Sequence, residues 1–534
     1  MSCSSAVSND VLSNEDLMNV VFGYLLEDVD FPPLYRSRRQ LLWVALTCKS
    51  FLEPALDALW TSLPGLPPLL KLIPNLSLAG DTYVIGNSNN DRKWDKVQAY
   101  GRRVRSIVIE HKSQPPQTVS PFAYQVISMC AGSEATNLFP NLKTLTVNLT
   151  GWRDYASAFL ALSSCLEKIE LIHIQGSNDA EFVRAFLTAL PAKAKNLRKL
   201  ELSGKGDASV VDSLFQIHHF KGLSDLTLML SDVSIPLQLL VALGRLRNLS
   251  SLTLHPTNIA STSSSPYLFS VPPVKMEGGS VPMFPALSYL TIGGSPGDIA
   301  TSLSYTISPR IQKLSLLLKS ERESEAHLVD CFQRISSMCP NLQAFEISCT
   351  IKGKIIPSIL PLLDLKALTF FRIDAGILSC SNELVATIAT SLPNLTTLHL
   401  PAVSGSQSPD LGCLILLASH CPSLIDVRIC LNLDTPPGRV LPSSGDGETN
   451  PGQRSIKHTR EKSSHGLQSL WISDSGGDRG FSVAEMIAMA RFLLVLFPQL
   501  ETFGLHKNSR GEGKGKASVF QDIFSILCAV REGV

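Results

Sequence analysis

A short phrase, apolar-x-x-apolar-x-apolar, recurs along most of this 534-residue chain and limits what the chain can fold into. Fourteen copies begin at residues 104, 142, 166, 197, 223, 249, 287, 311, 342, 365, 395, 424, 467 and 500. Six copies have Pro two residues before the first apolar anchor, although only 33 of the 534 residues are Pro. From residue 142 onward the intervals average about 30 residues, a length typical of units that stack into a solenoid.

Each copy of the phrase predicts a strand with one buried face. The residue between the second and third anchors is called position five below, and alternation of apolar and polar residues around it is typical of a half-buried strand. Position five is polar in eleven copies, namely Thr146, Glu170, Glu201, Thr227, Thr253, Thr291, Ser315, Glu346, Thr369, His399 and Arg428. Stretches between the strands have helical spacing, and Ser482 with Glu485 forms a capping-box pattern before the last helix.

These phrases resemble leucine-rich repeats in a long and degenerate form. The fold class that we predict is an α/β solenoid, an irregular leucine-rich-repeat horseshoe over residues 102–510. Two stretches rich in Ser and Pro interrupt it at 257–282 and 432–465, and we expect inserted loops there, the second of them disordered. Residues 511–534 are expected to form a flexible C-terminal tail.

The charge balance argues against nucleic acid and membrane as partners. The chain has 47 Lys and Arg against 46 Asp and Glu, so no overall field would steer it onto phosphates or anionic lipid. Basic stretches at 193–199 and 454–462 leave a nucleic-acid patch or a nuclear import signal open, although solvated surfaces are the commoner role of such stretches.

The twelve cysteines include no C-x-x-C pair, so buried free thiols are expected rather than a disulfide or zinc framework. The first residues, MSCSSAVSND, lack the basic and apolar regions of a signal peptide. The most apolar stretches fall short of the ~20 residues that a membrane-spanning helix needs. We therefore expect a soluble intracellular protein that is cytoplasmic, nuclear or both.

The sequence contains no recognisable catalytic or cofactor motif. The GEGKGKAS run at 511–518 lacks the spacing of a phosphate-binding loop, and no Cys, Asp or Glu stands at metal spacing beside His218 and His219. One alternative is a hydrolase or transferase that uses His399 with acids such as Glu170, Glu201 and Glu346, but no nucleophile and base can be paired from the sequence. We expect no enzyme, no cofactor and no metal site.

The N-terminal region has a different pattern from the repeats. After a disordered terminus at 1–10, residues 11–62 predict three short helices at Glu15–Leu26, Arg38–Cys48 and Lys49–Trp60, each with one apolar face. Residues 63–101 are expected to be a linker and a connecting helix. About fifty residues bury too little surface to be comfortably stable alone, so either a partner or the solenoid should cover the remaining apolar face.

Two runs in this region, LSNEDLMNVVFGYL at 12–25 and LLWVALTCKSFLEPALDALW at 41–60, resemble the F-box of large fungal families. The run WDKVQAYGRRVRSIVI at 94–109 is similar to the segment that joins the box to its repeats in those proteins. One departure is Ser13, where the family usually has Pro.

The resemblance implies a function as the substrate receptor of a Skp/cullin/F-box ubiquitin ligase. A Skp-type adaptor would bind the box, and the repeats would present a target protein to the other subunits for ubiquitin transfer. The residues that it implies for adaptor binding are Leu12, Leu17, Val21, Phe22, Leu25, Leu41, Val44, Cys48, Phe51 and Trp60, about half of which are expected to form the core of the box or to pack on the first repeat instead. An F-box-like repeat scaffold that acts outside any ligase is the alternative.

In a solenoid the position-five side chains project together from one sheet face, which makes a large binding surface. Its C-terminal third offers His399, Arg428 and Trp471, and Arg and Trp are enriched among residues that dominate binding energy. We therefore predict that these three residues bind the protein substrate. The alternative for Trp471 is that the 432–465 insertion or the last helix folds over it.

Overall fold

The computed structural model divides the chain into two compact units. Unit 1 takes in the described residues up to Ile235, and unit 2 takes in those from Pro236 onward. The structure describes residues 14–27, 35–73, 76–86, 94–110, 118–130, 138–150, 155–255, 258–260, 283–306, 308–319, 325–349, 355–356, 359–374, 377–378, 380–400, 408–434, 465–474, 481–505 and 514–532.

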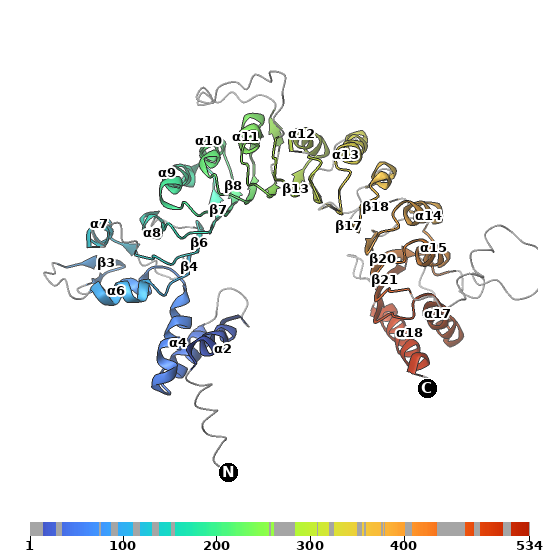
Figure 1. The fold of residues 1–534 in the computed structure, drawn as a ribbon, viewed down its shortest axis with the longest axis horizontal. Coiled ribbons are helices and arrows are strands. Elements are labelled where there is room, and N and C mark those ends of the chain that lie inside the picture. Colours follow the sequence, from blue (N-terminus) through green and yellow to red (C-terminus); the bar gives the residue numbers. More distant parts are fainter. Residues whose placement is uncertain are drawn as a thin grey trace, which may run out of the picture. The chain divides into compact units, whose positions relative to one another are not determined.

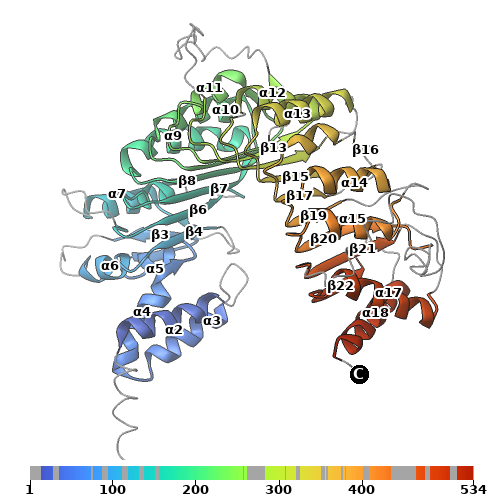
Figure 2. The ribbon, with the colours of Figure 1, turned by 45° about the vertical axis from the view of Figure 1, so that its right-hand side comes forward.

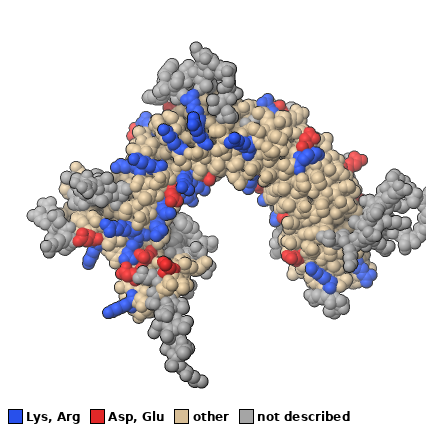
Figure 3. Space-filling view, in the orientation of Figure 1, with Lys and Arg blue, Asp and Glu red and all other residues tan. Residues whose placement is uncertain are grey.

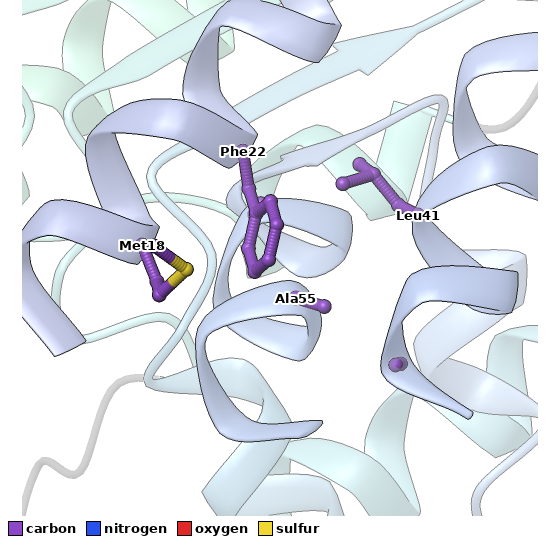
Figure 4. Packing of buried hydrophobic residues seen from close by; sticks show 6 residues of the cluster. Met18, Phe22, Leu41 and Ala55 are labelled. Carbon is purple, nitrogen blue, oxygen red and sulfur yellow. The ribbon is translucent and has the colours of Figure 1, made fainter. Parts of the chain in front are cut away.

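Unit 1 begins with a three-helix bundle formed by α2 (Glu15–Glu27), α3 (Tyr35–Ala45) and α4 (Lys49–Thr61). The second helix ends earlier than the sequence predicts, so that Cys48 is not its last residue but precedes the first residue of α4. Apolar side chains from all three helices meet inside the bundle (Figure 4). The buried cluster consists of Met18, Phe22, Leu41, Ala45, Ala55 and Ala58.

We expected a linker and a connecting helix over residues 63–101; the helix is present, but the rest of the described segment is folded rather than a linker. The segment contains α5 (Pro67–Leu70), the hairpin of β2 (Leu76–Ala79) and β3 (Thr82–Ile85), and α6 (Trp94–Gly101). Strand β1 (Ser62–Leu63) already belongs to the main sheet, because it pairs in parallel with β4 (Ser106–Ile109). Leu66, Leu69 and Leu70 are buried, so this segment carries too many packed apolar side chains to act as a linker.

The main sheet of unit 1 is parallel, and its strands follow one another in the order β1-β4-β6-β7-β8-β9. The further strands are β6 (Thr144–Asn148), β7 (Lys168–Gln175), β8 (Lys199–Lys205) and β9 (Asp225–Ser231); β5 (Thr118–Val119) pairs with β3 instead. The helices of this unit that follow β4 are α7 (Pro121–Cys130), α8 (Tyr155–Leu160), α9 (Ser177–Lys193), α10 (Ala208–Leu214) and η2 (Phe215–His219).

Unit 2 repeats the same plan, with parallel strands in the order β11-β13-β14-β15-β17-β19-β20-β21-β22. These strands are β11 (Ser251–Leu254), β13 (Tyr289–Gly294), β14 (Lys313–Leu318), β15 (Ala344–Cys349), β17 (Phe370–Asp374), β19 (Thr397–His399), β20 (Asp426–Leu431), β21 (Ser469–Asp474) and β22 (Thr502–Leu505). Short strands lie outside this order at β10 (Ser234–Pro236), β12 (Asn258–Ala260), β16 (Ile355–Ile356) and β18 (Ile377–Leu378). The helices are α11 (Leu237–Leu243), α12 (Pro296–Thr306), α13 (Glu325–Met338), η4 (Leu360–Asp364), α14 (Asn382–Ser391), α15 (Gly412–His420), α17 (Val483–Leu496) and α18 (Lys514–Glu532).

Within each unit the helices that alternate with the strands lie on one face of the sheet, whereas α2 to α4 form a separate bundle beyond β1 (Figures 1 and 2). The other face, which we call the open face, carries the residues that alternate with the buried anchors. The anchors themselves form the core: Leu142, Leu145 and Val147, for example, are fully buried. Parallel strands in sequence order, most of them followed by a described helix, confirm the α/β solenoid within each unit.

A row of asparagines joins successive repeats. In several copies Asn stands directly before the first anchor, and its side-chain amide donates a hydrogen bond to a carbonyl oxygen of the preceding repeat. The bonds run from Asn196 to Ser164, from Asn341 to Pro309 and from Asn394 to Lys366, at 3.0, 3.3 and 3.1 Å. The Pro-Asn-Leu text of the sequence therefore serves the stacking of repeats.

The C-terminal region corrects a second expectation. Residues 514–532 form the helix α18, which packs on α17 and on the last strand, β22. Phe520, Ile523 and Leu527 are buried in that contact. A solenoid needs its terminal repeat covered, so this helix serves as the end cap of unit 2 rather than as a flexible tail.

Most of the two predicted inserted loops, 257–282 and 432–465, lies outside the described residues. Their ends are folded: β12 occupies 258–260, and the buried His465 begins the next repeat. Among the described residues no helix is long and apolar enough to cross a membrane.

Candidate functional site

The bundle of α2 to α4 exposes an unusual number of large apolar side chains. Leu17 is 44%, Trp43 56% and Leu46 74% exposed. The exposed set consists of Leu17, Val20, Val21 and Tyr24 on α2 with Leu42, Trp43 and Leu46 on or directly after α3, and we call it the apolar surface. Isolated exposed apolar residues are ordinary, but a concentration of them on two neighbouring helices is typical of a protein-binding surface.

The residues that the sequence suggested for adaptor binding separate into three groups. Leu17, Val21 and Cys48 are exposed. Phe22 and Leu41 are enclosed in the bundle core, while Val44, Phe51 and Trp60 are half-buried. Leu12 and the side chain of Leu25 lie outside the described residues. The sequence missed Val20, Tyr24, Leu42, Trp43 and Leu46, because a helix carrying apolar residues on several sides does not reveal which side faces its own core.

Several contacts fix the bundle to the first repeat. Arg103 makes ion pairs with both Glu53 and Asp57 of α4. Burial opposes the charge of Arg103, but hydrogen bonds and attraction from these two acids outweigh that effect and raise its pKa. The rings of Trp60 and Tyr100 also pack against each other in a tilted arrangement, with centroids 4.5 Å apart.

The register of the strands aligns the position-five residues into two continuous rows. In unit 1 the row is Val108, Thr146, Glu170, Glu201 and Thr227. In unit 2 it is Thr253, Thr291, Ser315, Glu346, Arg372, His399, Arg428, Trp471 and Gly504. His399, Arg428 and Trp471 are therefore direct neighbours on successive strands, as the sequence predicts.

The sequence analysis assigned one residue of the unit 2 row incorrectly. Glu346 pairs across the sheet with Arg372, and Arg372 pairs with His399, so position five of that strand is Arg372 and not Thr369. The phrase therefore begins at Leu368 rather than at Leu365. The signal was present in the spacing, because the intervals 368 − 342 = 26 and 395 − 368 = 27 are more even than those around 365.

His399 is buried and bonded within the protein. Its Nε2 lies 2.6 Å from Oδ2 of Asp426. Burial alone would raise the pKa of Asp426, but hydrogen bonds from His399 and Ser469 and the nearby charge of Arg428 lower it. His399 therefore orients Asp426 instead of presenting a contact surface. Its partner is also none of the acids Glu170, Glu201 and Glu346 that the enzyme alternative invoked.

The two arginines of the row differ in their partners. Arg372 makes ion pairs with Glu346 and Asp374, so its charge is already neutralised. Arg428 has no ion-pair partner among the described residues, and its Nε is buried without a hydrogen bond. The terminal nitrogens of the Arg428 guanidinium are consequently the ones available to a ligand.

The indole of Trp471 lies against the backbone of Gly504 on the next strand. A Cβ placed on Gly504 would come within 2.8 Å of Cζ3 of Trp471, so only glycine leaves room for the ring. The indole Nε1 donates a hydrogen bond to Oγ of Ser469 at 3.0 Å. Trp471 stays half-buried, which leaves part of the ring accessible.

The open face of unit 1 carries both basic and acidic side chains. Lys168 pairs with Glu170 at 2.5 Å, and Thr146 donates a hydrogen bond to the same carboxylate at 2.8 Å. Burial opposes ionisation of Glu170, yet these bonds together with Lys168 and Lys199 lower its pKa. Basic and acidic side chains both appear along this unit in Figure 3. In the basic stretch at 193–199, Lys199 lies near the carboxylate of Glu170, and the stretch at 454–462 lies outside the described residues.

The thiols and histidines offer no metal centre within the part of the chain that is described, since no group of three possible ligands occurs there. His218 and His219 are exposed at the end of η2, with ring centroids 3.8 Å apart. Cys331, Cys339 and Cys380 are free and buried, and burial raises the pKa of each thiol to about 12. The expectation of buried free thiols is confirmed for these residues, which are protonated and unreactive at neutral pH.

No protein-family model and no curated protein sequence matches this chain. Among solved structures, the leucine-rich-repeat protein LIC12759 of Leptospira interrogans has a TM-score of 0.34 and 14% identity, over 76% of this chain and 97% of that one. The yeast Rad7 and Elc1 complex has a TM-score of 0.29 and 12% identity, over 80% and 90%. The ectodomain of the Arabidopsis thaliana receptor kinase GASSHO1/SCHENGEN3 has a TM-score of 0.23 and 13% identity, over 84% and 51%. The assignment of the repeat fold follows from the strand pairing described above.

Proposed function

We propose that this chain is the substrate receptor of a Skp/cullin/F-box ubiquitin ligase. In this proposal the bundle of α2 to α4 is the F-box and binds a Skp-type adaptor, and the open face of the repeats binds the protein to be ubiquitinated. The chain itself catalyses nothing and acts in the cytoplasm, the nucleus or both. The observation that carries the proposal is the apolar surface of the bundle, which is large for so small a module.

Burial separates the bundle residues into those that form its core and those proposed to contact the adaptor. Phe22 and Leu41 hold the three helices together from inside. Leu17 and Val21 face outward with the rest of the apolar surface and are the proposed contacts to the adaptor. Cys48, Phe51 and Trp60 lie on or next to α4, and we assign Trp60 to the attachment of the bundle to the repeats because its ring packs against that of Tyr100.

Co-purification with a Skp-type adaptor tests this proposal. Val21→Asp and Leu46→Asp each place a charge on the apolar surface without touching the core, so both should abolish adaptor binding while the thermal unfolding midpoint stays unchanged. Phe122→Asp on α7 is the matched control, since Phe122 is also exposed but lies outside the bundle. Adaptor binding that survives both bundle variants would contradict the proposal.

The second candidate function is a repeat scaffold that acts outside any ligase. The side-chain row that contains Arg428 and Trp471 favours a protein-binding role under either function. A purified chain that binds no Skp-type adaptor yet keeps its target would favour the scaffold.

A further inference from the structure

The open face of unit 2 contains one preformed aromatic platform. The indole of Trp471 lies against the backbone of Gly504 on the next strand, and its Nε1 donates a hydrogen bond to Oγ of Ser469. Ser469 also hydrogen-bonds Asp426, which His399 fixes in turn. The indole therefore does not need to be ordered when a ligand arrives, which reduces the entropic cost of binding.

Arg428 stands on the strand next to this platform, in direct register with Trp471. Among the described residues of strands β15 to β22 it is the arginine that makes no ion pair: its charge acts on Asp426, but that carboxylate is bonded by His399, whereas Arg372 is held by Glu346 and Asp374. Its Nε is sealed from solvent, so a ligand must approach the two terminal nitrogens of the guanidinium. This planar end matches the two oxygens of a carboxylate.

A carboxylate fits this position better than a phosphate. Asp426 lies two residues from Arg428 on the same strand, and its negative charge would repel a doubly charged phosphate more strongly than a singly charged carboxylate. The accessible indole beside Arg428 in turn favours an apolar side chain, because a flat ring gives much contact area.

From this geometry we infer that Arg428, Trp471 and Gly504 form a docking site for a linear segment of the target protein that carries Asp or Glu close to an aromatic or aliphatic residue. Neighbouring strands are ~4.8 Å apart and residues of an extended peptide are ~3.3 Å apart, so the acid and the apolar residue stand one or two positions apart. The inference deepens the proposed receptor function and rests on it for its biological meaning.

Selection of a phage-displayed random-peptide library on the full-length protein tests the inference. Enriched peptides should carry Asp or Glu within two positions of an apolar residue, and this enrichment should disappear on Arg428→Gln. Lys313→Gln is the matched control, because Lys313 is an exposed cation on β14 of the same unit, and it should leave the enrichment intact. The inference fails if no peptide is enriched, if the enriched peptides lack an acid, or if they are enriched equally on Arg428→Gln.

Affinities of a synthetic peptide from that selection then separate the two parts of the site. Arg428→Gln should weaken binding roughly tenfold to a hundredfold, as expected for a lost charge-assisted hydrogen bond, and Lys313→Gln by less than about twofold. Gly504→Ala should displace the indole, so that the apolar residue of the peptide no longer contributes while the acid still does. Tighter binding of a peptide with phosphoserine in place of the acid would overturn the carboxylate assignment.

Adaptor co-purification distinguishes failure of the docking site from failure of the proposed receptor function. Arg428→Gln should leave adaptor binding unchanged, because the apolar surface lies on a separate part of the chain. Loss of adaptor binding with retained peptide binding would remove the ligase role and leave the docking site, and the reverse result would remove the docking site alone.

Discussion

The bundle and the repeats differ in how completely they bury their apolar side chains. Along the repeats, each strand and helix is covered by the next copy, and anchors such as Leu290 and Leu314 are completely or almost completely buried. The bundle precedes the first repeat and is not built from the strand-and-helix unit that stacks along the sheet. Its residues Trp43 and Leu46 consequently remain exposed. Exposed apolar residues also occur singly along the repeats, as at Phe122, but on the bundle they gather on two neighbouring helices, which is where a partner is expected.

The largest expected contrast is in the free energy of unfolding, between loss of a buried apolar residue of the repeats and loss of an exposed one of the bundle. Phe345→Ala in unit 2 removes a fully buried ring whose centroid lies 5.8 Å from that of Phe371, and should lower the free energy of unfolding by about 3–5 kcal/mol. Leu46→Ala on the bundle should change it by less than about 0.5 kcal/mol. Chemical denaturation of both variants measures the contrast. Equal losses would mean that Leu46 is covered within the chain itself.

Acid should lower the stability of the repeats through protonation of His255. Burial, helped by the positive charge of Lys319, lowers the pKa of His255 to about 4. Because the unfolded chain binds this proton near pH 6.5 and the folded one only near pH 4, stability should fall by about 2–3 kcal/mol between these values and level off below. The bundle helices contain no His.

Denaturation of wild type and His255→Gln across that pH range checks this expectation. The variant should show a flatter profile between pH 6.5 and 4. An unchanged profile would show that His255 is protonated equally well in the folded and unfolded chains, and would assign the acid sensitivity to other groups.

Helix capping offers a smaller contrast. Ser482 caps α17 through a complete capping box with Glu485, whereas Cys48 at the start of α4 makes no side-chain cap. Ser482→Ala should therefore cost about 1 kcal/mol of stability, and Cys48→Ala almost nothing. Thermal unfolding of the two variants measures both effects. A comparable loss for Cys48→Ala would show that the start of α4 depends on that side chain.

The smallest expected effect concerns the attachment of the bundle. Arg103→Ala removes the ion pairs with Glu53 and Asp57, both of which are largely exposed, so the loss should be below about 1 kcal/mol. Hydrogen exchange should nevertheless become faster in α4, where those acids lie. Arg102→Ala, next in sequence and exposed, is the control and should leave that exchange unchanged.

The sequence predicted the strands of the repeats well because their signal is local and repeated. Alternation around position five fixes which side chains are buried, and His399, Arg428 and Trp471 fall in one row as expected. The error at Leu365 arose because two overlapping triplets of apolar residues satisfy the phrase there. Only pairing with Glu346 on the neighbouring strand selects Arg372.

Longer-range features could be predicted less well. Phe520, Ile523 and Leu527 have helical spacing, but nothing local shows that this helix covers β22. Glu346 and Asp374 neutralise Arg372, and Asp426 bonds His399; these three acids come from three different strands. Charge pairing across a sheet requires the register, so residue type alone could not separate the available arginine from the neutralised one.

Hydrogen exchange of the full-length protein, with and without a purified Skp-type adaptor, tests the central claim most directly. If the apolar surface on α2 and α3 is the binding surface, then the adaptor should slow exchange in these helices and leave β15 to β22 unchanged. Slowed exchange along the repeat strands, or no change in α2 and α3 at a saturating adaptor concentration, would contradict the account.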